Sequence, residues 1–150
     1  MPSTSANSSE ILKRMRDFTT HQSTRVALYK EFEESFDQNH QGKLSDAEFA
    51  LICQITTDGF NEVSHDIRNV ESDMNGPLNR PDLGGLIRDV QELEREKLKL
   101  TVNTQIYMKQ QLTSEQDFDT LIQDTRHSLT KILDQINEKM RDVHEIMAEL

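Results

Sequence analysis

The residues whose types and spacing could do chemistry lie in one short stretch, residues 37–48, DQNHQGKLSDAE. Oxygen-bearing side chains alternate before a glycine and an acid closes the stretch. This follows the calcium-loop template D-x-[DN]-x-[DN]-G-x5-E except at the fifth position, where Gln41 is a longer, neutral ligand. Gly42 stands where such a loop turns sharply, and Leu44 stands at the position of its apolar anchor. The positions that could hold calcium are Asp37, Asn39, Gln41, Lys43 through its backbone carbonyl, Ser45 and Glu48.

The same stretch has a second interpretation as a capped turn between two helices. Gly42 would break the first helix, and Ser45 would cap the next one, with Glu48 three residues later completing a capping box. Among the calcium side chains only Asp37 and Glu48 are charged, so a calcium site here would have low affinity. EF-hand loops usually work in pairs, and the sequence contains no second loop of this kind.

No other group of residues has the spacing of an active site. A Gly-rich phosphate loop, a nucleophile elbow and a Cys–His pair are all missing from the sequence. Cys53 is predicted to be a small core residue, and as the single cysteine it rules out an internal disulfide. We therefore expect no enzyme, and no cofactor other than low-affinity calcium. The histidines lack metal-binding spacing and are expected on helix surfaces: His21, His40, His65, His127 and His144.

Composition narrows the classes of partner. The chain has 150 residues, 34% hydrophobic and 29% charged, which suits long amphipathic helices that bury one stripe. Its net charge of −10 repels phosphate, so direct binding to nucleic acid is not expected. Between residues 80 and 99, five acids balance five bases, which indicates a mixed solvated face.

The sequence also carries expectations about location. No apolar run approaches the roughly 20 residues that a membrane helix needs. The first residues, MPSTSANSSE, lack the basic and apolar regions of a signal peptide, and one cysteine fits a reducing compartment. We expect an intracellular protein of the nucleus, the cytoplasm or both.

Apolar residues at steps of three and four predict two long helices in the first half of the chain. The first should start after Ser8 or Ser9, behind a disordered lead-in over residues 1–9. The second should run over residues 46–73, with a kink or short break at Thr56 to Gly59 because β-branched residues and glycine favour helices poorly. The expected buried faces are Ile11, Met15, Phe18, Gln22, Val26, Tyr29, Phe32 and Phe36, then Phe49, Ile52, Thr56, Phe60, Val63, Ile67, Val70 and Met74.

Two further helices are predicted in the second half. Gly76 should end the second helix in a left-handed C-cap, and Pro81 fits the first turn of a third helix that fades at residues 110–113. Gly84 and Gly85 in that first turn either allow close packing or are simply tolerated. A coiled-coil-like helix follows at about 115–150. The expected buried faces are Leu86, Val90, Leu93, Lys97, Leu100 and Tyr107, then Phe118, Ile122, Thr125, Leu129, Ile132, Ile136, Met140, Val143, Met147 and Leu150.

These elements predict an all-α fold, an elongated antiparallel helical bundle or coiled coil of about four long helices. Residues 10–150 would form a single helical domain. An alternative is a two-helix hairpin that completes its core by forming a homodimer, because long seams with few aromatic residues leave edges to cover.

The most distinctive stretch is residues 76–101, GPLNRPDLGGLIRDVQELEREKLKLT, in which paired prolines lead into a dense helical pattern. With the GFNEVS step before it, this stretch resembles the required-for-excision B domain family, small helical domains associated with DNA repair. The likeness extends over about 26–111. The motif residues are Gly76, Pro77, Leu78, Arg80, Pro81, Asp82, Leu83, Glu94, Glu96, Lys97, Leu98, Leu100 and Thr101.

The resemblance implies a role in DNA repair or the DNA damage response, without catalysis and through protein partners. It brings no active-site residues to this chain. The residues themselves favour an acidic helical adaptor, with an exposed apolar strip that receives a partner helix. Two alternatives remain, a weak calcium-binding EF-hand-like protein and a structural coiled-coil component of a larger assembly.

Overall fold

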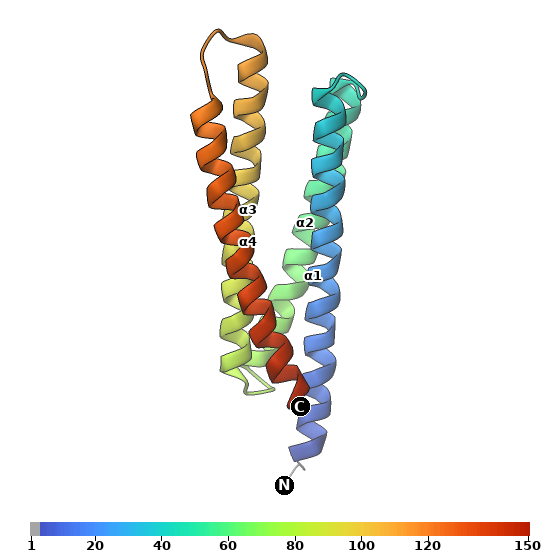
Figure 1. The fold of residues 1–150 in the computed structure, drawn as a ribbon. Helices are drawn as coiled ribbons and strands as arrows, with labels where there is room; N and C mark the ends of the chain where they lie inside the picture. The colour runs from blue at the N-terminus through green and yellow to red at the C-terminus, as the bar shows by residue number, and fades with distance from the viewer. Residues whose placement is uncertain (1–3) are drawn as a thin grey trace. The chain divides into compact units, whose positions relative to one another are not determined.

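The computed structural model describes residues 4–150, with side chains from Asn7 onward, and this part of the chain is all-α without strands (Figure 1). The fold class predicted from the sequence is confirmed, with four long helices. The chain divides into two compact units. Unit 1 comprises Met1–Gly85 with Met147–Leu150, and unit 2 comprises Leu86–Ile146. The helices are α1 (Thr4–His40), α2 (Asp46–Asn75), α3 (Pro81–Thr113) and α4 (Asp119–Ala148).

The start of α1 differs from the prediction. The helix begins at Thr4, before the expected start after Ser8 or Ser9, because no glycine or proline interrupts the chain from there to His40. Of the lead-in predicted over residues 1–9, the first three residues lie outside the described part of the chain. The single helical domain over 10–150 stays a prediction, since the boundary between the two units falls inside α3.

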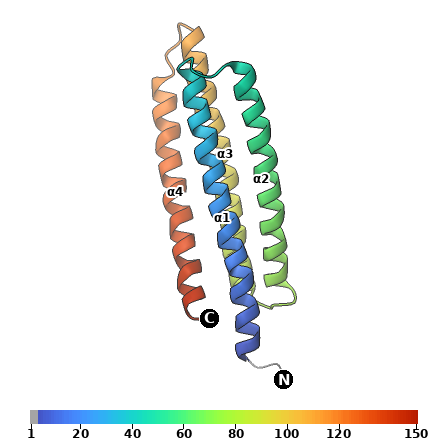
Figure 2. The same cartoon turned by 90° about the vertical axis from the view of Figure 1, so that its right-hand side faces the viewer.

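In unit 1, α1 and α2 form an antiparallel hairpin and lie side by side in both ribbon views (Figures 1 and 2). An ion pair ties the beginning of α1 to the end of α2: Arg14 Nε lies 2.8 Å from a carboxylate oxygen of Asp73, and Arg14 Nη1 lies 2.8 Å from Asp17. Partial burial disfavours the charge of Arg14, but the hydrogen bonds to Asp17 and Asp73 outweigh it and raise the pKa of the guanidinium. The pair therefore fixes the open end of the hairpin.

The buried face of α1 corrects one predicted core residue. Val26 is 56% exposed, whereas its neighbour Arg25 is only 3% exposed. Arg25 stays inside because its guanidinium donates to Gln22 Oε1 at 3.0 Å and to Ser64 Oγ at 3.4 Å. The other predicted positions are confirmed as buried: Ile11, Met15, Phe18, Gln22, Tyr29, Phe32 and Phe36.

The kink or short break predicted at Thr56 to Gly59 does not interrupt α2, which is continuous there. The buried Thr56 hydroxyl donates to the backbone carbonyls of Ile52 at 2.9 Å and Cys53 at 3.0 Å, so its polar group is satisfied within the helix. A Cβ on Gly59 would lie 3.0 Å from Leu28 Cδ2 on α1. The glycine thus lets Leu28 pack against the backbone of α2, and this packing offsets the low helix propensity.

The core of unit 1 continues along α2. Aromatic rings fill the core from the middle of the hairpin, where the Tyr29 and Phe60 rings lie 4.8 Å apart, to the end near the α1–α2 turn, where those of Phe36 and Phe49 lie 6.0 Å apart. Two predicted positions at that end, Phe49 and Ile52, are only half-buried. The remaining predicted face of α2 is confirmed as buried: Thr56, Phe60, Val63, Ile67, Val70 and Met74.

Unit 2 is a second antiparallel hairpin, made by α3 from Leu86 onward and by α4 up to Ile146 (Figure 1). The Gln111 side chain holds the connection, donating to Asp119 Oδ1 at 2.8 Å and accepting from the Phe118 backbone N–H at 3.2 Å. The Tyr107 and Phe118 rings stack 6.0 Å apart beneath it. The fourth helix begins at Asp119, a few residues later than the predicted start at 115.

The two helices of unit 2 differ in how well their buried faces were predicted. Every predicted position of the α4 seam is buried or half-buried, and Ile122, Ile136 and Val143 are the most buried of them. In α3 only Val90 of the predicted seam is buried. The apolar residues of α3 lie along two neighbouring stripes of the helix, and only one of these stripes is buried. The buried residues along it, apolar and polar together, are Leu83, Ile87, Val90, Glu94, Thr101 and Thr104.

Candidate partner-binding site

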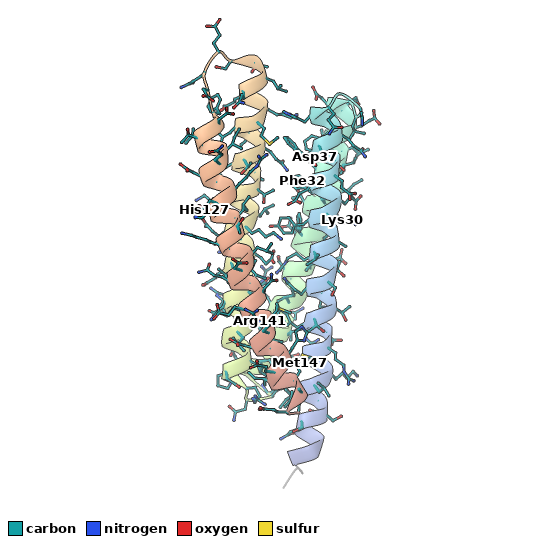
Figure 3. The ribbon with its side chains drawn as sticks, in the orientation of Figure 1. Lys30, Phe32, Asp37, His127, Arg141 and Met147 are labelled. Carbon is teal, nitrogen blue, oxygen red and sulfur yellow. The ribbon has the colours of Figure 1, made fainter. Side chains whose placement is uncertain are left out.

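The calcium-type residues 37–48 are spread over two helices and the turn between them. Asp37 and Asn39 belong to the last turn of α1, and Figure 3 shows Asp37 near the α1–α2 turn. Gln41 and Lys43 lie in the turn itself, Ser45 is the N-cap of α2, and Glu48 is in the first turn of α2.

The contacts in this stretch are those of a capped turn. Gly42 has φ +78°, a left-handed conformation that favours glycine. Asn39 Nδ2 closes the turn by donating to Leu44 O at 3.0 Å and to Asp46 Oδ1 at 2.8 Å. Ser45 Oγ accepts from the Glu48 N–H, and the Glu48 carboxylate accepts from the Ser45 N–H, which confirms the capping box. The calcium hypothesis stays a prediction, and a bidentate ion would compete for the Glu48 oxygen that accepts from the Ser45 N–H, whereas Asn39 uses only its Nδ2 in these bonds.

Replacing Ser45 with alanine is expected to lower the free energy of unfolding by about 1 kcal/mol, because the Glu48 N–H loses its acceptor. Urea denaturation followed by circular dichroism measures this loss. The exposed Ser23, in the middle of α1, is the matched control, and its replacement by alanine should change stability by less than about 0.5 kcal/mol. An equal loss in both variants would show that the cap contributes nothing particular.

The calcium hypothesis is tested by thermal melts in millimolar calcium and in chelator. A bound ion raises the melting temperature, and that rise should disappear in Glu48→Gln. If calcium leaves the melting temperature unchanged, the Ser45 cap alone accounts for this turn.

The first half of the family-like motif builds the α2–α3 turn. Gly76 has φ −109°, so the left-handed C-cap predicted there is wrong, and Asn79 takes the left-handed conformation instead with φ +50°. Asn tolerates that region better than most residues with a side chain. Backbone N–H groups of the turn satisfy the last carbonyls of α2 through the pairs Gly76–Ser72 at 2.9 Å, Leu78–Asp73 at 3.0 Å and Arg80–Met74 at 2.6 Å.

An ion pair stands at the start of α3. Arg80 Nε and Nη2 donate to the two carboxylate oxygens of Asp82 at 2.9 and 2.8 Å, a bidentate arrangement. The hydrogen bonds from Arg80 lower the pKa of Asp82 and outweigh the opposing effect of burial. Pro81 occupies the first helical position, as predicted. These motif residues therefore shape the turn.

The carboxyl of Asp82 is expected to titrate below its ordinary range in the native protein and to return toward that range in Arg80→Gln. A lowered native pKa means that the pair stabilises the fold at neutral pH and loses this effect as the pH falls through that pKa. Carbon-13 NMR titration of the aspartate side chains measures both variants. An unchanged Asp82 titration in Arg80→Gln would contradict the assignment.

The second half of the motif runs along α3 and faces several directions. Glu94 and Thr101 are buried, and the Thr101 hydroxyl donates to the Lys97 carbonyl at 2.8 Å. Lys97, Leu98 and Leu100 are half-buried, and Glu96 is exposed. Of the motif residues, Glu96 alone lines the groove described next.

A groove of about 510 Å³ runs between α3 and α4. Half-buried Leu93 and Ile132 supply its apolar surface. Lys139 Nζ lies 3.2 Å from Asp89 Oδ2 and links the two helices across it. The lining residues are Asp89, Glu92, Leu93, Glu96, Ile132, Gln135, Glu138 and Lys139. Such a groove can hold long side chains of a partner.

Most of the groove residues were missed from the sequence, since the register of α3 against α4 brings them together. The signal that was present is Glu92 and Glu96, which stand four residues apart on one helical face. The apolar spacing of the sequence predicts Leu93 and Ile132 in buried seams, and both are half-buried.

The histidines and the cysteine gather at no common point. His65, His127 and His144 are exposed as predicted, whereas His21 and His40 are half-buried. His40 stacks on Phe36 with ring centres 5.5 Å apart. Cys53 is half-buried on α2. Within residues 4–150, no three His, Cys, Asp or Glu side chains are grouped to hold a metal, and no helix is long and apolar enough to cross a membrane.

Comparison with known proteins identifies the family. Residues 13–109 match the model of the DNA repair REX1-B family, a span that includes α2, the α2–α3 turn and most of α3. The chain belongs to the DNA repair REX1-B family. The resemblance expected over about 26–111 is confirmed, and the match begins earlier, in α1. The REX1-B span includes Asp89, Glu92, Leu93 and Glu96 on one side of the groove, while the α4 side lies beyond it.

The chain is also similar to a named relative. It is 32% identical over 124 residues to the heterochromatin silencing protein rss1 of Schizosaccharomyces pombe, a stretch that covers 83% of this chain and 90% of that protein. An alignment of this extent includes more of the chain than the REX1-B match does.

Proposed function

We propose that this REX1-B protein is a non-enzymatic helical adaptor in DNA repair that acts through protein partners. The observation that carries the proposal is the open groove between α3 and α4, with apolar surface from Leu93 and Ile132 and a charged rim. Two antiparallel helices with such a groove suit a partner helix that lays one face between them. The sequence supports a role without catalysis, because it contains no Gly-rich phosphate loop, nucleophile elbow or Cys–His pair.

The same proposal includes the place of action. Membership of a DNA repair family and similarity to a protein named for heterochromatin silencing both favour the nucleus. A chain with net charge −10 would reach chromatin through a protein partner rather than through phosphate contacts.

A second candidate function is heterochromatin silencing, favoured by the similarity to rss1 over 83% of this chain. An adaptor without chemistry of its own could serve either process through different partners. The two functions are separated by replacing the rss1 coding sequence of Schizosaccharomyces pombe with that of this chain. Survival after DNA damage reports on repair, and a reporter gene placed in heterochromatin reports on silencing.

We expect the replaced strain to survive DNA damage better than a strain that lacks rss1. Restored silencing with no effect on survival would favour the second function. The adaptor proposal would be overturned by turnover of a DNA or protein substrate that survives purification and is abolished by a single point mutation. A stable homo-oligomer by light scattering that captures no other protein would favour the structural coiled-coil alternative.

A further inference from the structure

The charges along the α3–α4 groove are unbalanced. Four carboxylates line it against one ammonium group, that of Lys139, which is paired with Asp89 at 3.2 Å. Glu92, Glu96 and Glu138 project from the rim with exposed side chains. Glu92 has a local partner in Arg88, 3.2 Å away in an exposed pair that contributes little. The groove therefore attracts a cationic occupant.

The apolar lining of the groove indicates which kind of cation fits it. Leu93 and Ile132 offer half-buried apolar surface below the carboxylates. Lysine and arginine have long aliphatic stems that lie along apolar surface while their charged ends reach outward. Glu92 and Glu96 stand four residues apart, so their carboxylates are neighbours on one face of α3. A helical occupant with bases at the same spacing would present its charges with the same repeat.

We propose that the α3–α4 groove binds a basic helical segment of a partner protein, with lysine or arginine at positions i and i+4 around one apolar residue. The bases pair with Glu92, Glu96 and Glu138, and the apolar residue contacts Leu93 and Ile132. This inference rests on the proposed adaptor function and specifies its partner. Charge complementarity disfavours the other occupants, because a second copy of this chain carries a net charge of −10 and nucleic acid carries phosphates.

The test uses a fluorescein-labelled helical peptide of lysine, arginine and alanine with one central leucine, and a counterpart in which glutamate replaces every base. Fluorescence anisotropy at low ionic strength measures binding to the full chain. In the groove variant, Glu92, Glu96 and Glu138 are all changed to glutamine. In the control variant, the exposed Glu31, Glu34 and Glu62 of unit 1 are changed in the same way, so that both variants lose three negative charges.

We expect the basic peptide to bind the wild-type chain, to bind the groove variant at least tenfold more weakly, and to bind the control variant within twofold of wild type. The acidic counterpart should not bind, and circular dichroism should show the same helix content in all three proteins. Replacing the central leucine by serine should also weaken binding, which net charge alone does not explain.

Three results would overturn the inference. The first is equal weakening in the groove and control variants, which would reduce the attraction to overall charge. The second is a concentration-dependent dimer in light scattering that the groove variant loses, which would make a second copy the occupant. The third is peptide binding that none of these changes affects. Failure of the adaptor function is seen separately, because the strain replacement in Schizosaccharomyces pombe is scored without the peptide.

Discussion

Replacing Arg25 with alanine is expected to lower the free energy of unfolding by about 2–3 kcal/mol. The side chain is 3% exposed, so its truncation removes buried packing as well as a charge. Its guanidinium donates to Gln22 Oε1 at 3.0 Å and to Ser64 Oγ on α2 at 3.4 Å, and both acceptors would lose this donor. Urea denaturation followed by circular dichroism at 222 nm, a wavelength that reports helix content, measures the change.

The neighbouring residue provides a matched control. Val26 is 56% exposed, and Val26→Ala should change stability by less than about 0.5 kcal/mol. Arg25→Met keeps most of the aliphatic volume and removes the donors, so it separates packing from hydrogen bonding. A larger loss in Val26→Ala than in Arg25→Ala would contradict the observed orientation of α1, since the apolar spacing alone places Val26 in the core.

The second large effect is expected at Gly84, in the first turns of α3. Gly84 is buried, and a Cβ there would lie 2.7 Å from Cγ of Asn75, the last residue of α2, and would also contact its Oδ1. Gly84→Ala must therefore displace the Asn75 side chain or the start of α3, at a cost of about 1–3 kcal/mol. Urea denaturation measures this cost as well.

Gly85 is the control for this prediction, because a Cβ on it would meet no atom within 4 Å. Gly85→Ala is expected to raise stability by up to about 1 kcal/mol, since alanine favours the helix over glycine. Combining Asn75→Ala with Gly84→Ala should recover part of the loss if the two side chains collide. Equal effects of alanine at Gly84 and Gly85 would show that close approach plays no part.

The sequence left open whether Gly84 and Gly85 allow close packing or are simply tolerated, and the structure answers this for each glycine. Both stand in the first turns of α3, and helix propensity treats them alike. The structure separates them, because Gly84 allows the end of α2 to approach α3 and Gly85 faces open space. The family-like motif around these glycines thus specifies the α2–α3 turn. The bidentate pair of Arg80 with Asp82 also stabilises this turn.

Local features of the sequence determined the four helices, most of their ends, and the capped turn at Ser45. Caps and breakers act within a few residues, so they can be recognised without knowing the neighbours of a helix. The seam of α4 was also predicted correctly, because its apolar residues recur on one face only. The distinctive prolines and helix of residues 76–101 were sufficient to indicate the REX1-B family.

The tertiary structure decided which face of each helix is buried and where the groove lies. In α3 the apolar residues fit two stripes, and in α1 either Arg25 or Val26 could continue the stripe, so packing partners made the choice. Arg25 is accepted inside because Ser64, distant in sequence, offers an acceptor. The groove arises because the packing of α3 against α4 brings Glu92 and Glu96 to the same surface as Glu138. A sequence specifies periodicity along one helix, whereas burial and binding surfaces depend on contacts between residues far apart along the chain.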